Sequence, residues 1–421
     1  MKLRILIMLV LSSHVFISPA QNSPYLADLY ALRNIIEKTP SYQAQIQKRK
    51  RLAYEALYKK LVVDSVSNTG DYRYFYNLAQ LLFPIRDNHL GFYQVPDYSQ
   101  FKTEESIQQY LSSKAFREFP SLSIDFDSLK RQLENKPLDS IEGIYYYGNL
   151  YTVGLFKKSP KEYTGVVLSS KVNWWEAGQI AINLFEFEPG LFKAIYSHPI
   201  TKNYYLYPVE RYRNHSLLNA SFYGSLFGGV YAKDSAGIDH VRLPATTPRF
   251  VLKNIAGNIQ YLRVGSFQLN PATAQASKKF YDSVRNALNG AYMILDLRNN
   301  EGGAKKPANN YFNLVKRFAR KKRVYVLLNN ETISQAELLT LRLRKLKNVT
   351  TVGQTTKGML AYGSNFGRTL RLPSNLFAVY PTDMKRSKER LLYEDYGIKP
   401  AIMLNNQQDW IEQVAALIIH K

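Results

Sequence analysis

The sequence of 421 residues predicts a multidomain protein that ends in an α/β domain. In the C-terminal part, short apolar runs typical of strands alternate with amphipathic helical segments. The middle of the chain carries short, alternating, Tyr-rich runs, and the part before it carries apolar residues at helical spacing. We therefore expect a helical domain, a β-rich barrel or sandwich module and an α/β domain over residues 21–120, 140–250 and 255–421, respectively.

The helices and strands expected in each part follow from the spacing of the apolar residues and from the turn-forming residues between the apolar runs. Helices are expected between residues 24 and 83, where Leu26, Leu29 and Leu32 share one helical face. Strands are expected between residues 141 and 243, because Gly, Pro, Asn and Ser separate the alternating runs. In the C-terminal part the expected order is strand 259–267, helix 271–288, strand 291–297, helix 307–318, strand 323–328, helix 334–346, strand 350–353 and helix 410–420.

The composition excludes several classes of protein. The chain is 45% hydrophobic and 13% aromatic, which is too apolar for a disordered protein. It contains no cysteine, so disulfides, thiol nucleophiles and cysteine-ligated metals are excluded. No histidine or carboxylate cluster in the sequence has the spacing of metal ligands. We predict neither a metal nor another cofactor.

The formal net charge of +23 raises the question of an anionic partner. Clustered Lys and Arg bind nucleic acid, but the basic runs here have no glycine-rich or aromatic nucleic-acid motif beside them. We therefore predict no nucleic-acid function. Attraction to an anionic envelope surface or to acidic substrates explains the charge as well.

The first residues are typical of a bacterial secretory signal. Lys2 and Arg4 precede an apolar stretch, and residues 18–20 (SPA) offer a small-residue cleavage site. The apolar stretch is too short for a membrane-spanning helix, which needs about 20 apolar residues. We predict that residues 1–20 are a signal peptide and that the mature protein is a soluble periplasmic or extracellular protein.

Two loops that follow neighbouring strands are candidates for chemistry, because ligand sites of α/β sheets lie at the carboxyl ends of strands. The first, residues 296–303 (DLRNNEGG), ends in Gly302 and Gly303, which leave backbone N–H groups uncovered. The second places Ser334 at the start of a helix. There it is either a plain N-cap or a nucleophile next to the N–H group of Gln335.

The order of these loops resembles the C-terminal-processing and tricorn-core serine peptidases. The similarity covers residues 259–404 together with one upstream segment. It implies a crotonase-like (ClpP/crotonase) α/β catalytic domain. The matching segments are, in chain order, residues 86–91 (RDNHLG), 296–303 (DLRNNEGG), 334–337 (SQAE), 352–358 (VGQTTKG) and 394–400 (EDYGIKP).

The resemblance implies a role for each matching polar residue. Ser334 is the implied nucleophile and His89 is the base that takes its proton. Glu394 is implied to orient or support the histidine. Asn88 stands where the tricorn-type constellation often has a serine that bridges to the acid, and its amide can donate the same hydrogen bond.

The resemblance also implies an oxyanion hole and a branch of the family. The implied hole consists of the N–H group of Gln335 together with that of Gly302 or Gly303. Met359 occupies the position of the lysine base of the processing branch, and Lys357 does not match that position. This favours the tricorn-type histidine mechanism. The middle module resembles that of secreted bacterial peptidases that lack a PDZ segment.

We therefore expect a secreted serine endopeptidase that acts on peptide or protein substrates. The competing hypothesis is a catalytically inactive binding protein that keeps the peptidase fold and uses the β module for recognition. Departures from the family pattern at Asn88, Gln354 and Ala401 motivate it. The oligomeric state is left open by the sequence.

Overall fold

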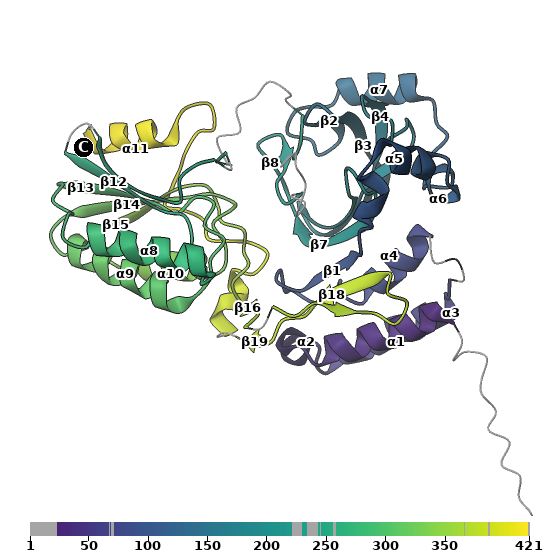
Figure 1. Ribbon diagram of the computed structural model, residues 1–421, viewed down its shortest axis with the longest axis horizontal. Coiled ribbons are helices and arrows are strands. Elements are labelled where there is room, and N and C mark those ends of the chain that lie inside the picture. The colour runs from purple at the N-terminus through teal and green to yellow at the C-terminus, as the bar shows by residue number, and fades with distance from the viewer. Residues whose placement is uncertain are drawn as a thin grey trace, which may run out of the picture.

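The computed structural model describes residues 23–66, 68, 71–220, 230–233, 243–244, 246–255, 258–365, 367–385 and 388–419. It has a mixed α/β composition with two large sheets. A helical N-terminal part and a curved β module lie on one side of the molecule, and an α/β domain lies on the other (Figure 1). The predicted signal peptide, residues 1–20, lies outside the described residues.

The N-terminal part is helical, as the spacing of its apolar residues predicts. Its helices are α1 (Pro24–Glu37), α2 (Pro40–Gln45), α3 (Arg49–Val63), α4 (Tyr72–Gln80), α5 (Glu104–Leu111), α6 (Lys114–Arg117) and α7 (Phe126–Glu134), with a 3-10 turn η2 (Tyr98–Phe101). Helices α1 and α2 each begin with a proline. The side chains of Ser23 and Thr39 cap these two helices by accepting hydrogen bonds from backbone N–H groups. Leu29, Leu32 and Leu78 belong to the core that joins α1 to α4. Helix α7 packs instead against the β module through Leu129 and Leu133.

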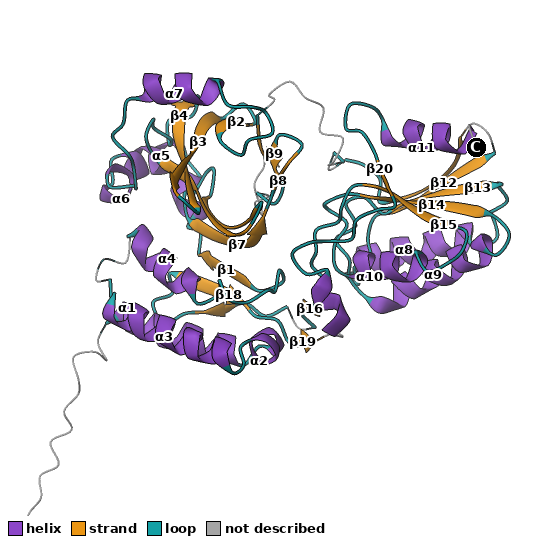
Figure 2. Ribbon diagram, turned by 180° about the vertical axis from the view of Figure 1, so that it is seen from behind, coloured by secondary structure: helices purple, strands orange, loops and turns teal. Residues whose placement is uncertain are grey.

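The β module is the centre of an antiparallel sheet of 12 strands. In sheet order these are β17 (Leu370–Arg371), β18 (Phe377–Tyr380), β1 (Gly91–Gln94), β7 (Tyr204–Glu210), β6 (Leu191–Ser197), β5 (Ile180–Glu188), β4 (Glu162–Ser170), β3 (Tyr151–Ser159), β2 (Gly143–Tyr147), β10 (Tyr231–Ala232), β9 (Ser216–Leu217) and β8 (Tyr212–Arg213). Strands β2 to β7 form a meander. The sheet curls around a core that includes Tyr147, Tyr196 and Tyr231 (Figure 2).

The α/β domain contains a six-stranded sheet with helices on both faces. Its strands, in sheet order, are β11 (Phe250–Ile255), β12 (Ile259–Val264), β13 (Tyr292–Asp296), β14 (Arg323–Leu328), β15 (Val349–Gly353) and β20 (Ile402–Met403). Its helices are α8 (Pro271–Val284), α9 (Lys305–Ala319), α10 (Gln335–Leu343) and α11 (Trp410–Ile419). Alternate strand residues face opposite ways, with Leu262 toward α8 to α10 and Tyr261 toward Trp410 of α11. All strand pairs except β11–β12 are parallel.

Not every residue after position 255 lies in the α/β domain, which differs from the expected boundary. The segment 362–385 crosses to the N-terminal part, where β18 pairs antiparallel with β1. Phe377 joins the core of the N-terminal helices, and Asp28 accepts two hydrogen bonds from Ser374. These contacts join positions far apart in the chain, so local sequence patterns do not reveal them.

The remaining elements lie where the two sides of the molecule meet. Strands β16 (Tyr362–Gly363) and β19 (Met384–Lys385) form a two-stranded sheet, followed by the 3-10 turn η3 (Lys388–Leu392). Among the helices of the described residues, none is both long enough and apolar enough to cross a membrane.

Candidate active site

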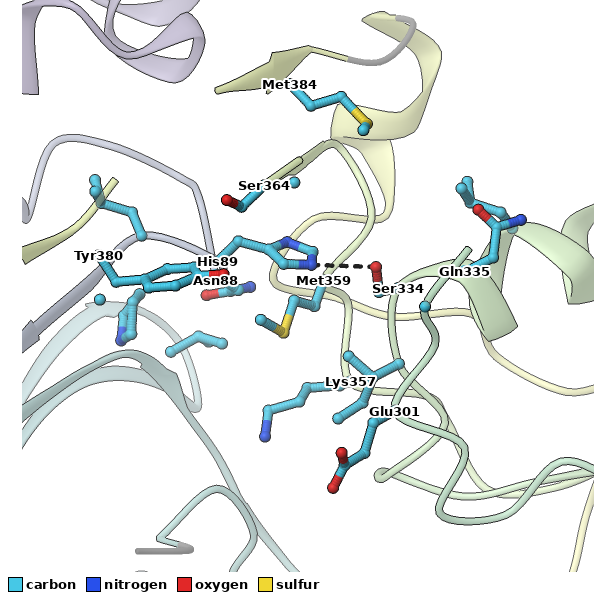
Figure 3. Close-up of a pocket in the computed structure, with 18 of the residues that line it drawn as sticks. Asn88, His89, Glu301, Ser334, Gln335, Lys357, Met359, Ser364, Tyr380 and Met384 are labelled. Carbon is cyan, nitrogen blue, oxygen red and sulfur yellow. Dashed lines mark hydrogen bonds between the residues drawn. The ribbon is translucent and has the colours of Figure 1, made fainter. Parts of the chain in front are cut away.

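His89 and Ser334, which are 245 positions apart in the sequence, meet in the structure. The Nε2 atom of His89 lies 3.1 Å from the Oγ atom of Ser334 (Figure 3). His89 lies in the turn before β1, and Ser334 lies in the turn between β14 and α10. This is hydrogen-bond distance, as proton transfer between the two side chains requires. The pair therefore joins the N-terminal part to the α/β domain.

The backbone at Ser334 has an unusual conformation. Its φ is 55° and its ψ is −111°, a region that residues with a Cβ atom rarely adopt. Such a conformation costs about 1–3 kcal/mol and persists only where surrounding contacts hold it. The side chain is 8% exposed and faces His89. The strained turn therefore presents the hydroxyl to the histidine.

The carboxylate of Glu337 ties the Ser334 turn to the loop after β15. It is fully buried and accepts hydrogen bonds of 2.6 to 2.9 Å from the N–H groups of Ser334, Gly358 and Met359 and from the Thr356 hydroxyl. Burial raises the pKa of Glu337, and these donors act in the opposite direction. The position of Glu337, three residues after Ser334, predicts a capping box with that serine, but it does not predict the contacts to the loop after β15.

Two other buried carboxylates hold the backbone of the histidine turn. Asp87 accepts hydrogen bonds from the N–H group of His89 at 3.1 Å and from the Thr382 hydroxyl at 2.6 Å. Glu394 accepts one from the N–H group of Asn88 at 2.8 Å. Burial raises the pKa of Asp87 to about 6, and burial together with the charge of Asp87 raises the pKa of Glu394 well above its ordinary value. The sequence places Asp87 in the RDNHLG segment that supplies the histidine, but indicates no separate role for it.

Glu394 also reaches the loop that follows Met359. Its second oxygen accepts hydrogen bonds from the N–H groups of Leu360 and Ala361 at 2.9 and 2.8 Å. The carboxylate therefore bridges this loop and the backbone of Asn88. Its support of the histidine turn runs through main-chain groups.

The side chain of Asn88 contacts the neighbour of the expected acid. Its Nδ2 atom donates to Oδ1 of Asp395 at 2.9 Å and to the carbonyl of Gly358 at 2.7 Å. The expected bridge from this amide to Glu394 is therefore wrong in detail: the Nδ2 atom is directed to Gly358 and Asp395, and Glu394 binds the backbone N–H group of Asn88. Asp395 is itself buried and pairs with Arg86 at 2.7 Å.

The two glycines after β13 lie against the Ser334 turn. Their φ angles are 87° at Gly302 and 124° at Gly303, and a Cβ atom on Gly302 would lie 2.8 Å from the nitrogen of Gln335. The N–H group of Gly302 donates to Oδ1 of Asn300 at 2.9 Å. Within the described part of the chain, the N–H groups of Gly303 and Gln335 have no recorded acceptor. The sequence leaves open whether Gly302 or Gly303 contributes to the oxyanion hole. In the structure, Gly303 is the one whose N–H group is available to donate.

Lys357 and Met359 lie near the pair but supply no base to it. Met359 carries no ionisable group at the position where the processing branch has lysine. The amine of Lys357 points away from Ser334 (Figure 3). The arrangement agrees with the expectation that the histidine, not a lysine, is next to the hydroxyl.

Arg211 connects the β module to the loops of the site. It directly follows β7 and is 3% exposed. Its guanidinium donates to the carbonyls of Lys357 at 3.1 Å, of Thr356 and Tyr396 at 3.5 Å, and of Asp395. Burial lowers the pKa of Arg211 to about 10. One cation thus holds two loops of the site, a role that no motif near Arg211 indicates.

His89 and Ser334 face a cleft of about 2160 Å³. Its lining includes Tyr93 of β1, Tyr205 of β7 and Leu338 of α10, so it runs between the sheet of the β module and the α/β domain. A cleft of this size has room for a segment of extended peptide. In the described ranges, no group of three or more His, Asp or Glu residues is arranged to hold a metal ion.

One family model matches the chain. Residues 308–404 match peptidase family S41, and this segment contains Ser334, Glu337 and Glu394. A search of curated proteins found no significant match.

Several solved structures are similar to the chain. A putative peptidase from Parabacteroides merdae is 13% identical with a TM-score of 0.40, and the alignment covers 94% of this chain and 97% of that one. A photosystem II D1 C-terminal processing protease is 13% identical with a TM-score of 0.36, covering 94% and 97%. A putative S41 protease from Bacteroides fragilis is 15% identical with a TM-score of 0.31, covering 77% and 92%. The match of residues 308–404 to peptidase family S41 confirms the resemblance seen in the sequence.

Proposed function

We propose that the protein is a secreted serine endopeptidase of the tricorn type, which hydrolyses peptide bonds in a crotonase-like α/β domain. The observation that carries the proposal is the 3.1 Å contact between His89 and Ser334, beside the N–H groups of Gly303 and Gln335, for which the described residues supply no acceptor. Met359, in place of a lysine base, supports the histidine branch. The signal-like residues 1–20 support a periplasmic or extracellular location.

In the proposed reaction, the Oγ atom of Ser334 attacks the carbonyl carbon of the substrate while Nε2 of His89 takes the hydroxyl proton. The N–H groups of Gly303 and Gln335 donate to the oxyanion of the tetrahedral intermediate. A donor in such a position is worth about 10²- to 10³-fold in rate. The N-terminus of α10 adds a favourable dipole for the same negative charge.

Breakdown of the intermediate uses the same base. His89 gives its proton to the leaving amine, which departs and leaves an acyl group on Ser334. Water then loses a proton to His89 and attacks the acyl carbon, and the proton returns to Oγ as the acid product leaves. Asp87 and Glu394 act as positioning residues in this scheme, since their hydrogen bonds hold the backbone of the histidine turn.

Hydrolysis of casein and of fluorogenic peptides by purified mature protein tests the proposal. We expect Ser334→Ala and His89→Ala to lower kcat by about 10⁵- to 10⁶-fold, as in other serine peptidases. Ser283→Ala, an exposed serine on α8, is the matched control and should behave as wild type. Normal rates in both site variants would refute the mechanism, and loss of activity only in Lys357→Ala would indicate a lysine base. Peptide binding without any hydrolysis would favour the alternative of an inactive binding protein.

A further inference from the structure

The charged side chains along the cleft are unevenly distributed. The loops that carry Gly303 and Ser334 contribute Glu301, Lys305 and Glu331 to the lining, and Lys357 lies beside them. Two carboxylates therefore face two lysines. The end of the cleft that holds the serine is close to neutral.

The other end of the cleft is strongly basic. Arg342, Arg344 and Lys345 line it from α10 and the turn after it, and Arg390 lines it from η3. We call these four residues the basic wall. In the described ranges none of the four forms an ion pair, and Glu389 is the only carboxylate lining the cleft beside them. Burial lowers the pKa of Arg390, and Glu389 acts to raise it.

Two arginines of the basic wall, Arg342 and Arg344, are ordered by neutral groups. The Nη1 atom of Arg342 donates to Oδ1 of Asn309 at 2.6 Å, and its guanidinium lies 3.8 Å from the ring centre of Phe312. The Nη2 atom of Arg344 donates to the hydroxyl of Tyr393 at 2.5 Å. These contacts hold the side chains without neutralising them. Ordered, unpaired guanidinium groups are preformed donors for carboxylates.

We propose that the cleft selects acidic peptides, with Asp or Glu side chains of the substrate bound by the basic wall. This rests on the proposed function, because it assumes that the peptide is cleaved at Ser334. A helical rise of about 1.5 Å per residue puts Arg342 and Arg344 about 12–15 Å along α10 from Ser334. An extended peptide advances about 3.3 Å per residue, so the acidic residues lie about four or five positions from the cleaved bond.

A peptide fits this charge pattern better than a nucleic acid does. A nucleic acid carries a phosphate at every position and would bring negative charge to Glu301 and Glu331. A peptide can place neutral residues there and acidic residues at the basic wall. The opposite side of the cleft offers the aromatic rings of Tyr205 and Tyr207 and a single arginine, Arg371, in place of a cluster of cations.

Binding to the Ser334→Ala variant tests the inference without requiring turnover. The probes are fluorescein-labelled peptides of equal length that carry either Glu or Gln at the positions four and five residues from a central bond, on one side or the other. At low ionic strength we expect one of the two Glu peptides to bind about tenfold tighter than the Gln peptide substituted at the same positions. This difference should shrink with added salt. Equal binding of Glu and Gln peptides would overturn the inference.

Two charge-matched variants locate the effect. Arg344→Gln/Lys345→Gln removes two exposed members of the basic wall, and Arg320→Gln/Lys321→Gln removes one exposed Arg and one exposed Lys that do not line the cleft. The preference for Glu should disappear in the first variant and persist in the second. Equal effects of the two would show that net charge, not the basic wall, attracts the peptide, and would contradict the inference.

Hydrolysis of the same peptides by the protein with Ser334 intact separates the two proposals. A higher kcat/KM for the Glu peptide, lost with Arg344→Gln/Lys345→Gln, supports both. Ser334-dependent cleavage without a preference for Glu refutes acidic selection alone. Preferential binding of Glu peptides without cleavage refutes the proposed function alone. Tighter binding of a single-stranded oligonucleotide than of the Glu peptide, lost through the same substitutions, would make the basic wall a nucleic-acid site and overturn the inference.

Discussion

The serine side and the histidine side of the site are assembled in different ways. The serine side is local, because Glu337 binds the N–H group of Ser334 only three positions away. The histidine side is built from distant segments, since Glu394 binds the N–H group of Asn88 across 306 positions and Asp87 binds Thr382 across 295. The serine side therefore forms when the α/β domain folds, whereas the histidine side also needs the packing of the N-terminal part.

The loop after β15 is common to both sides. Glu337 binds its Gly358 and Met359 N–H groups, and Glu394 binds the N–H groups of Leu360 and Ala361 just after them. The buried carboxylates of Glu337, on the serine side, and Glu394, on the histidine side, therefore both hold the loop after β15 by hydrogen bonds. Displacing this loop should disturb the nucleophile and the base together.

The largest expected difference between the two sides is the loss of stability when the buried carboxylate of each side, Glu337 or Glu394, is replaced by an amide. Glu337→Gln should lower the free energy of unfolding by about 2–4 kcal/mol, because the amide nitrogen would face N–H groups whose hydrogen bonds the carboxylate accepts in the wild type. Glu394→Gln should cost less, about 1–2 kcal/mol, because its amide nitrogen can be turned toward the single N–H group of Asn88. Urea unfolding of both variants measures the difference.

Activity of the same two variants gives the control. Both should lose peptidase activity, and Glu394→Gln should do so while keeping most of the stability of the wild type. A larger loss of stability in Glu394→Gln than in Glu337→Gln would contradict the contrast between the two sides.

The pH dependence of stability should reveal the buried carboxyl of Asp87. The folded protein holds its proton up to a pH of about 6, whereas the unfolded chain releases it near 3.8. The stability that the protonated group contributes is therefore present below about pH 4 and is lost as the pH rises to about 6. The loss is on the order of 2–3 kcal/mol.

Asp87→Asn should remove this part of the pH dependence, because an amide can keep the contacts to His89 and Thr382 without titrating. Urea unfolding of wild type and Asp87→Asn between pH 4 and about 7 measures the two slopes. Parallel slopes would mean that Asp87 titrates alike in the folded and unfolded chains.

The smallest expected effect concerns the strained turn of the serine side. Glycine adopts positive φ without a Cβ penalty, so Ser334→Gly should be about 1 kcal/mol more stable than Ser334→Ala. Both variants lack the hydroxyl, so their difference isolates the backbone. Thermal or urea unfolding of the pair checks it, and a more stable alanine variant would show that the turn carries no strain.

The same contrast explains what the sequence could predict. Ser334 and the glycines follow strands of regular period, and β14 (Arg323–Leu328) agrees with the expected bounds. His89 was found through its resemblance to a family motif and not through local spacing. The roles of Asp87 and Arg211 depend on contacts between distant segments, and so does the pairing of β18 with β1 of the N-terminal part. Local periodicity carries no information about such contacts.

Labelling with a serine-directed fluorophosphonate probe tests the central claim most directly, because the probe reacts only with an activated hydroxyl. The account predicts covalent labelling of the wild type and of Ser283→Ala, none of Ser334→Ala, and labelling slowed by orders of magnitude in His89→Ala. Labelling that persists undiminished in Ser334→Ala, or a wild-type protein that the probe does not label, would contradict it.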